Sequence, residues 1–495
     1  MAPSTPRSLS APGSARPRKK SLALLLFLGL LGMSMIILLS SLSLLPAHNV
    51  HPPLHPLLEL SKGAMGLQEP PAADQYHVVF STGCSPSQHW QALMFFYHAW
   101  KAKQPGTVTR IASGCDTDQQ EEQQRIFNEQ IAILSDQFRI HFTPDFTRPD
   151  KTKTYNHESV KYFNKPFGLR HWMTHVLGYP DNANQYDDDI IMILDPDMML
   201  MKPLTHHFDP KMHRFVTEPV DNITTVRHGH PFAQLYGFGS SWRNCMKGNI
   251  SHVVGTNDSP VLDMTDSDAN DYYPAGPPYI ATARDMYRIA TTWCDFLPRM
   301  HDVFPQFMAE MHAYSTAAAH LRLPHLLART FMVSDVGAAF NEGWDFLDEV
   351  PRANACRSGV ELTQPNAPAV FHYCQRYAVG RWFVGKYKLR EDFFTCAAPL
   401  LRDPPQDVSV KYNWWIYPNN VESVNYTEKT FRQQEIVQNG WAMCKLIESL
   451  NEAATHYKKH HCHGGADGEA NYAKEEIFHP QDRFDDFLEN GGYHG

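Results

Sequence analysis

The sequence has little charge and no basic excess. Of its 495 residues only 20% are charged, and 53 Asp and Glu against 44 Lys and Arg give a net charge of −9. Because a nucleic-acid-binding protein usually carries a basic face, this balance argues against nucleic acid as a partner. The content of 43% hydrophobic residues excludes a disordered chain and a coiled coil. A mean hydropathy of −0.41 excludes a polytopic membrane protein.

A long apolar run occurs only once. Residues 21–45 carry no charge, and as a helix they would extend about 37 Å, more than the ~30 Å hydrocarbon core of a bilayer. Arg and Lys residues precede the run, and none follows before Lys62. The positive-inside rule therefore predicts a cytosolic tail at 1–20, a type II transmembrane signal-anchor at 21–45 and a lumenal remainder. The alternative is a cleaved signal peptide, whose apolar region is usually shorter, about 7–15 residues.

Cysteine is absent from the first 83 residues. All nine cysteines lie between Cys84 and Cys462, in the part predicted to be lumenal, where disulfides are permitted. An odd number leaves at least one thiol without a partner in the chain, and the sequence alone does not give the connectivity. The same part contains N-glycosylation sequons at Asn222, Asn249, Asn257 and Asn425.

Strand and helix patterns alternate from residue 75 onward. Compact β-type runs occupy 76–81, 108–112, 138–142 and 190–194, and helical patterns occupy 90–103, 118–134 and 165–177, with Asn164 as the expected N-cap of the last. The run at 190–194 is apolar throughout, which is typical of a strand buried on both faces. This alternation predicts an α/β fold with a mostly parallel sheet flanked by helices, in which ligands bind at the carboxyl ends of strands.

The segments before and after this α/β pattern have a different composition. Residues 46–74 are rich in Pro and His and predict a flexible stem. Residues 406–457 predict a C-terminal appendage with a helix over 429–457, interrupted near Asn439 and Gly440. Residues 458–495 predict a mobile tail, although its histidines and Cys462 could alternatively bind a metal.

Two carboxylates follow the buried run directly, as Asp195-Pro196-Asp197. Close like charges are costly unless a positive group lies between them, and a hard divalent cation bound to phosphates is the usual solution. The simpler reading is a turn with two solvated aspartates. A haloacid-dehalogenase-type phosphatase is a further alternative, but Met199 stands where those enzymes usually carry Thr or Val, and three predicted strands precede this one.

A histidine in an aromatic, glycine-rich setting lies far downstream. His372 is followed by Gly380 and Lys386. An imidazole can complete a Mn²⁺ site built from two carboxylates, and Lys386 could contact a diphosphate. Any single one of 27 histidines is more often an ordinary structural residue.

Several motifs together resemble one known family. They are Asp195-Pro196-Asp197-Met198 followed by Pro203, Asn164-Lys165-Pro166, Gly276-Pro277-Pro278-Tyr279, Glu310-Met311-His312-Ala313-Tyr314 and His372-Tyr373-Cys374-Gln375. In order and spacing they resemble the hydroxyproline O-arabinosyltransferase and peptidyl serine α-galactosyltransferase family, from about Tyr76 to about Pro405. The resemblance implies a GT-A (Rossmann-like) nucleotide-sugar-binding domain at 75–405 in the Golgi or endoplasmic reticulum membrane.

The resemblance also implies an activity and a site. The activity is metal-dependent, retaining transfer of arabinofuranose or galactose from a UDP-sugar to hydroxyproline or serine in a Ser/Hyp-rich polypeptide. A non-catalytic lumenal binding or scaffold protein of the same fold is the alternative. The implied metal ligands are Asp195, Asp197 and His372, and the residues implied near the nucleotide are Thr82, Gly83, Lys165, Asp195 and Lys386. Gly276 and Pro277 would form a loop at the donor sugar. The implied catalytic carboxylate is Glu310, with Asp335 as the second candidate.

Simpler structural readings exist for most of these residues. Glu310 in a first helical turn could merely complement the helix dipole, and Lys165 could be a solvated side chain. Asp335 could be a turn residue before Gly337, and Gly276-Pro277 could be only a rigid loop.

Overall fold

The computed structural model describes residues 75–148, 160–219, 223–338, 342–418, 426–430, 433–463 and 468–475. The predicted tail, signal-anchor and stem lie outside these residues, as do Asn222 and Asn425. Within the described ranges, no helix combines the length and apolarity that a membrane crossing requires. The described residues all belong to one compact unit, Gly66–Gly495.

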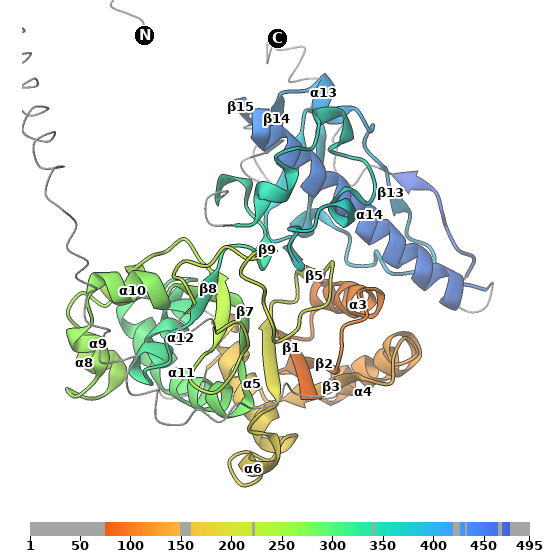
Figure 1. Ribbon diagram of the computed structural model, residues 1–495. Coiled ribbons are helices and arrows are strands. Elements are labelled where there is room, and N and C mark those ends of the chain that lie inside the picture. The colour runs from red at the N-terminus through yellow and green to blue at the C-terminus, as the bar shows by residue number, and fades with distance from the viewer. Residues whose placement is uncertain are drawn as a thin grey trace, which may run out of the picture. The chain divides into compact units, whose positions relative to one another are not determined.

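A seven-stranded sheet forms the centre of this unit (Figure 1). Its strand order is β3-β2-β1-β4-β7-β6-β8, and all neighbours run parallel except where β7 meets β4 and β6. The strands are β1 (Tyr76–Thr82), β2 (Thr107–Ser113), β3 (Phe138–Thr143), β4 (Ile190–Leu194), β6 (Phe232–Leu235), β7 (Ala275–Thr282) and β8 (Leu326–Ala328). The prediction of an α/β fold with a mostly parallel sheet is therefore confirmed.

Alternation along the strands gives the sheet two apolar faces. On one face Phe80 and Met192 belong to a cluster with helix α3 (Pro86–Lys101). On the other face Val79 and Ile191 belong to a cluster with α5 (Asn164–His175), α11 (Ala283–Val303) and α12 (Ala309–His320). This double covering explains why all five residues of β4 are buried.

Two of the predicted helices differ in detail. The pattern at 118–134 is α4 (Thr117–Ile126), which begins with a capping box at Asp116 and continues as a π-helix, Phe127–Ile131. Asn164 is not the N-cap of α5, because the helix starts one residue earlier than expected and no side chain caps it. The Asn164 Oδ1 atom accepts instead from Phe146 N (2.8 Å).

A smaller sheet lies beyond the carboxyl end of β4. Its order is β5-β10-β9, from β5 (Met198–Leu200), β10 (Val370–His372) and β9 (Met332–Val333). Strand β10 runs antiparallel to β5 and places His372 opposite Met198. Because Met198 follows Asp197 directly, this register brings the histidine beside the second aspartate.

The C-terminal helix is continuous and lies four residues further along the chain than predicted. Helix α14 spans Gln433–His461 without interruption. Gly440 lies inside this helix and does not break it. A Cβ at this position would be 2.0 Å from Ser409 Oγ, so the glycine permits close packing. Trp441 of α14 contacts Phe371 of β10, with ring centroids 5.2 Å apart.

Part of the predicted mobile tail is attached to the folded unit. Cys462 forms a disulfide with Cys396, and β16 (Lys474–Glu475) pairs with β13 (Leu400–Leu401). The remaining short elements are α6 (Ala183–Tyr186), α7 (Ser241–Asn244), α8 (Ile250–Val254), α9 (Pro260–Asp263), α10 (Asp266–Tyr272), α13 (Val408–Lys411), β11 (Arg376–Val379), β12 (Trp382–Gly385), β14 (Trp414–Pro418), β15 (Tyr426–Thr430) and 3₁₀ turns at Lys161–Phe163, Val336–Ala338, Trp344–Leu347, Arg352–Asn354, Val360–Thr363 and Lys386–Lys388.

Six of the cysteines pair. The disulfides are Cys84–Cys115, Cys356–Cys444 and Cys396–Cys462, and the free thiols are Cys245, Cys294 and Cys374. Three disulfides are typical of a protein of the secretory pathway.

Candidate functional site

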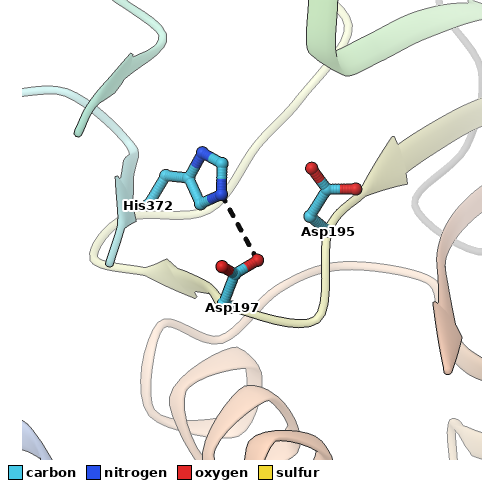
Figure 2. A group of neighbouring side chains, drawn as sticks. All are labelled: Asp195, Asp197 and His372. Carbon is cyan, nitrogen blue, oxygen red and sulfur yellow. Dashed lines mark ion pairs between the residues drawn. The ribbon is translucent and has the colours of Figure 1, made fainter. Parts of the chain in front are cut away.

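The acidic pair and the downstream histidine converge at the carboxyl end of β4. Asp195 follows β4, Asp197 precedes β5 and His372 ends β10. One ligand atom from each lies within 4.8 Å of the others (Figure 2). A backbone hydrogen bond from Tyr373 N to Asp197 O (3.0 Å) holds the two chain segments together. Two carboxylate oxygens and an imidazole nitrogen are a donor set that fits Mn²⁺, so the residues present fit the cation expected from the sequence.

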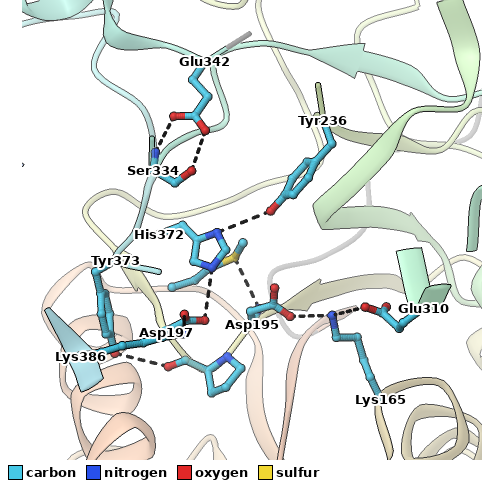
Figure 3. Close-up of polar contacts among 12 residues, drawn as sticks. Lys165, Asp195, Asp197, Tyr236, Glu310, Ser334, Glu342, His372, Tyr373 and Lys386 are labelled. Carbon is cyan, nitrogen blue, oxygen red and sulfur yellow. Dashed lines mark hydrogen bonds and ion pairs between the residues drawn. The ribbon is translucent and has the colours of Figure 1, made fainter. Parts of the chain in front are cut away.

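Each aspartate is paired with a lysine (Figure 3). Lys165 Nζ lies 2.7 Å from Asp195 Oδ1, and Lys386 Nζ bonds Asp197 Oδ2. Burial alone would raise the pKa of Asp197, but His372 and Lys386 outweigh it and hold that pKa well below its usual range. The structure thus places both predicted lysines at the acidic pair, and Lys165 is not a solvated side chain.

The imidazole of His372 has a partner at each ring nitrogen. Nε2 lies 3.3 Å from Asp197 Oδ1, and Nδ1 lies 3.5 Å from the hydroxyl of Tyr236. Burial lowers the pKa of His372, whereas Cys374 and Asp197 raise it, and the net shift is upward. The ring is therefore fixed between a carboxylate and a phenol, an arrangement that orients a metal-binding histidine.

Gly276 and Pro277 do not form a loop, contrary to the prediction. Both lie inside β7, where all residues are buried. The register between β6 and β7 shifts at Ala233 and Gln234. Just beyond this point the ring of Tyr236 lies against Gly276, where a Cβ would be 2.0 Å from the ring. Gly276 therefore makes room for the residue that contacts His372.

Glu310 lies beside the acidic pair. It is in the first turn of α12 and is only 5% exposed. Its Oε2 lies 3.2 Å from Lys165 Nζ, whereas Oε1 has no hydrogen-bond partner among the described residues. Burial raises the pKa of Glu310 to about 7, although Lys165 opposes the shift. The carboxylate is thus connected to Asp195 through a shared ammonium, which a purely helix-capping role does not explain.

Thr82 and Gly83 lie at the end of β1, as predicted, but their polar groups are partly occupied. Arg110 Nε donates to Thr82 Oγ1 (2.8 Å), and its NH2 donates to Gly83 O (3.2 Å). Burial lowers the pKa of Arg110 to about 10. The guanidinium fixes the chain where β1 ends, next to the disulfide between Cys84 and Cys115.

Asp335 has the contacts of a turn residue. Its Oδ1 accepts from Gly337 N (2.8 Å), which matches the simpler reading of that position. Its backbone N–H donates to Glu342 Oε2 (3.0 Å).

Tyr236, Arg110 and Glu342 are site-related residues that the sequence reasoning missed. Gly276 offered a signal for the first, because a glycine in an apolar run often marks close approach of another group. A lone arginine within the strand pattern at 108–112 was a signal for the second, since a buried guanidinium needs acceptors. Nothing in the sequence around Glu342 marked it.

Comparison with known proteins gives one distant relative. Over 405 residues the sequence is 23% identical to the peptidyl serine alpha-galactosyltransferase of Arabidopsis thaliana. The chain is a distant relative of that enzyme. The match covers 80% of this chain but only 40% of the relative's length. No family model matches the sequence.

Solved structures that are similar to this chain include two glycosyltransferases. Galactosyltransferase LgtC, solved with donor and acceptor sugar analogs, has a TM-score of 0.33 and 12% identity, covering 60% of this chain and 87% of LgtC. The bifunctional glycosyltransferase WbbM has a TM-score of 0.31 and 12% identity, and the match covers 63% of this chain and 47% of WbbM.

Proposed function

We propose that this protein is a metal-dependent, retaining glycosyltransferase of the GT-A type, which transfers a sugar from a UDP-sugar to a hydroxyl of a Ser/Hyp-rich polypeptide. The observation that carries the proposal is the convergence of Asp195, Asp197 and His372 at the carboxyl end of a buried parallel strand. Such strand ends are where nucleotides bind in open α/β sheets. The distant relationship to a peptidyl serine alpha-galactosyltransferase supports the same class of reaction.

Asp195, Asp197 and His372 would hold Mn²⁺ or another divalent cation, which supplies positive charge to the diphosphate when bound. Lys386 and Lys165 are the nearest cationic side chains. With the aspartates holding a cation, these two ammonium groups would be free to contact the phosphates. They would stabilise the negative charge that develops on the departing UDP.

Glu310 would face the sugar. In the reaction the bond from the anomeric carbon to the diphosphate oxygen breaks, a bond to the acceptor oxygen forms, and the acceptor loses its proton. The sugar becomes cationic in between, so a buried carboxylate near its ring lowers the barrier. Oε1 of Glu310, which has no hydrogen-bond partner among the described residues, would make this contact. Retention follows either through a covalent adduct of a carboxylate or by same-face attack with the proton passing to the leaving phosphate.

The name of the distant relative supports galactose and serine as donor sugar and acceptor, and the motif resemblance equally supports arabinofuranose and hydroxyproline. We also propose a Golgi or endoplasmic reticulum membrane location with a lumenal catalytic part, which the three disulfides support. Protease added outside sealed microsomes should leave Glu310-containing peptides intact. Their digestion would exclude this topology.

The full chain should be assayed with UDP-galactose and UDP-arabinofuranose, with and without Mn²⁺, on Ser- and Hyp-containing peptides, with products read by mass spectrometry. Cation-dependent UDP release and a glycosylated peptide are expected. Asp197→Ala should abolish both and leave the circular dichroism spectrum unchanged. Absence of cation-dependent UDP release from the wild type would favour a non-catalytic binding protein.

A further inference from the structure

A buried carboxylate is bonded to the residue that follows β9, the strand paired with the one that carries His372. Glu342 is 5% exposed, and its side chain accepts four hydrogen bonds. Oε2 accepts from Ser334 N (2.6 Å), Asp335 N (3.0 Å) and Trp344 Nε1 (3.0 Å), and Oε1 accepts from Ser334 Oγ (2.6 Å). None of these four donors carries a charge. Figure 3 shows the carboxylate directed at Ser334, on the same side of the site as His372.

The segment that Glu342 holds adjoins the metal-site strand. Ser334 follows β9, and β9 runs parallel to β10 with Val333 opposite Phe371. The buried hydroxyl of Tyr377 donates to Ser334 O (2.7 Å) and lies 3.2 Å from His372 O. One phenol therefore joins the residue that Glu342 fixes to the residue that would bind the cation.

We propose that Glu342 is a positioning residue for the metal ligand His372. By fixing Ser334 it fixes the acceptor of Tyr377, and through that hydroxyl it sets where β10 ends relative to Asp195 and Asp197. A cation site tolerates only small displacements of its ligands, so a shift of β10 weakens binding even though the three ligand side chains are unchanged. The inference rests on the proposed function, because it concerns the cation site of that function.

A purely structural role predicts a different outcome, and the chain provides a matched control. Asp285, in α11, is also buried, at 1% exposure. Its Oδ2 accepts from Gly229 N (2.6 Å), and its Oδ1 lies 3.4 Å from Arg288 Nη1. Asp285 follows β7, whose last residue, Thr282, is opposite Ile190 at the start of β4, so it lies at the end of the sheet away from Asp195. Replacing Asp285 should therefore cost stability and leave the cation site unchanged.

The test measures Mn²⁺ binding by isothermal titration calorimetry, together with thermal stability, on the full chain. Glu342→Ala should weaken Mn²⁺ binding about tenfold, the effect typical of losing a partner that orients a ligand. Glu342→Gln should restore most of the affinity, because its amide oxygen can replace Oε2 and its NH₂ can donate to Ser334 Oγ. Tyr377→Phe removes only the connecting hydroxyl and should weaken Mn²⁺ binding even if Glu342→Ala fails to fold. Asp285→Ala should lose stability with unchanged affinity.

The outcomes separate the two proposals. If the wild type binds Mn²⁺ and both Glu342→Ala and Tyr377→Phe bind it equally well, the positioning role is wrong while the proposed function stands. Equal weakening by Asp285→Ala would also overturn it, since any buried carboxylate would then have the same effect. If the wild type itself fails to bind Mn²⁺, the proposed function fails and this inference fails with it.

Discussion

The ring of Tyr236 occupies the space that a side chain at Gly276 would fill. A Cβ on residue 276 would lie 2.0 Å from Tyr236 Cδ2, a separation that real Cβ atoms do not show. Because the hydroxyl of the same ring lies 3.5 Å from His372 Nδ1, a glycine inside β7 controls a contact to the candidate metal ligand.

Gly276→Ala should therefore displace Tyr236 and reduce Mn²⁺ affinity and kcat/KM for UDP release, each by about tenfold. The physical reason is the loss of the partner that orients His372. In a Tyr236→Ala background the added methyl group has free space, so Gly276→Ala should cost little more there. A double-mutant cycle on Mn²⁺ binding measures this coupling. Fully additive losses would show that Gly276 acts through another neighbour.

Lys386→Met should have opposite effects on two ligands. The ammonium bonds Asp197 Oδ2, and a divalent cation has to displace it. Its removal should tighten Mn²⁺ binding in the absence of nucleotide about tenfold, or ~1.4 kcal/mol, and should weaken binding of UDP, which loses a cationic partner. Titration calorimetry with each ligand distinguishes these effects. Lys388→Met changes the net charge equally and is the control, while weaker Mn²⁺ binding by Lys386→Met would contradict the assignment.

Stability should fall in mild acid because of buried neutral histidines. His325 donates from Nδ1 to Leu323 O (3.1 Å) and accepts at Nε2 from Tyr314 (2.9 Å), and burial lowers its pKa to about 3. A base with a lowered folded-state pKa gives its full stability contribution above the unfolded value of about 6.5 and loses it as the pH falls toward 3. From pH 6.5 to 5 the loss is about 2 kcal/mol for such a histidine.

Urea unfolding at pH 7 and pH 5 measures this loss. His98, whose pKa burial also lowers to about 3, should add a similar amount. His325→Gln should reduce the difference between the two pH values, whereas replacement of the exposed His460 by Gln should not change it. An unchanged pH difference in His325→Gln would mean that this imidazole is not the titrating group.

The disulfide between Cys356 and Cys444 should stabilise the fold strongly, since it closes a sequence separation of 88 residues. The chain-entropy estimate for such a loop is about 4–5 kcal/mol. The variant with both cysteines replaced by Ser should lose up to this amount of unfolding free energy in urea titrations. Cys245→Ser, at a free thiol, provides the comparison. A loss as small as that of the control would show that this disulfide contributes little to the stability of the fold.

The local patterns predicted β1 to β4 of the seven-stranded sheet, because each of these strands carries its own apolar signal, but they did not predict β6, β7 and β8. They also predicted the aspartates, since a strand end fixes where Asp195 and Asp197 lie. The position of His372 depended on the pairing of β10 with β5, a long-range register that periodicity does not encode. The sequence marked His372 by its aromatic, glycine-rich setting and by the motif resemblance, and neither of these gives its position in space.

The misassigned positions share a physical cause. Gly276 was predicted to lie in a loop and Gly440 to interrupt a helix, and both predictions agree with the low intrinsic propensity of glycine for regular structure. In the fold both permit close contact, with Tyr236 and with Ser409. Likewise Asn164 read as a helix cap from its neighbours in sequence, whereas its partner is Phe146, on a segment that local patterns do not relate to it. In each case contacts with residues distant in the sequence, and not the local pattern, determine the role of the residue.

Helix α14 lies after β10 in the chain and supports it through the contact between Trp441 and Phe371. The ribosome therefore releases His372 before the residue that backs its strand has been made. All three candidate ligands therefore emerge before the aromatic contact that packs against β10 can form. A chain that ended within α14 before Trp441 would keep every candidate ligand and lack this contact.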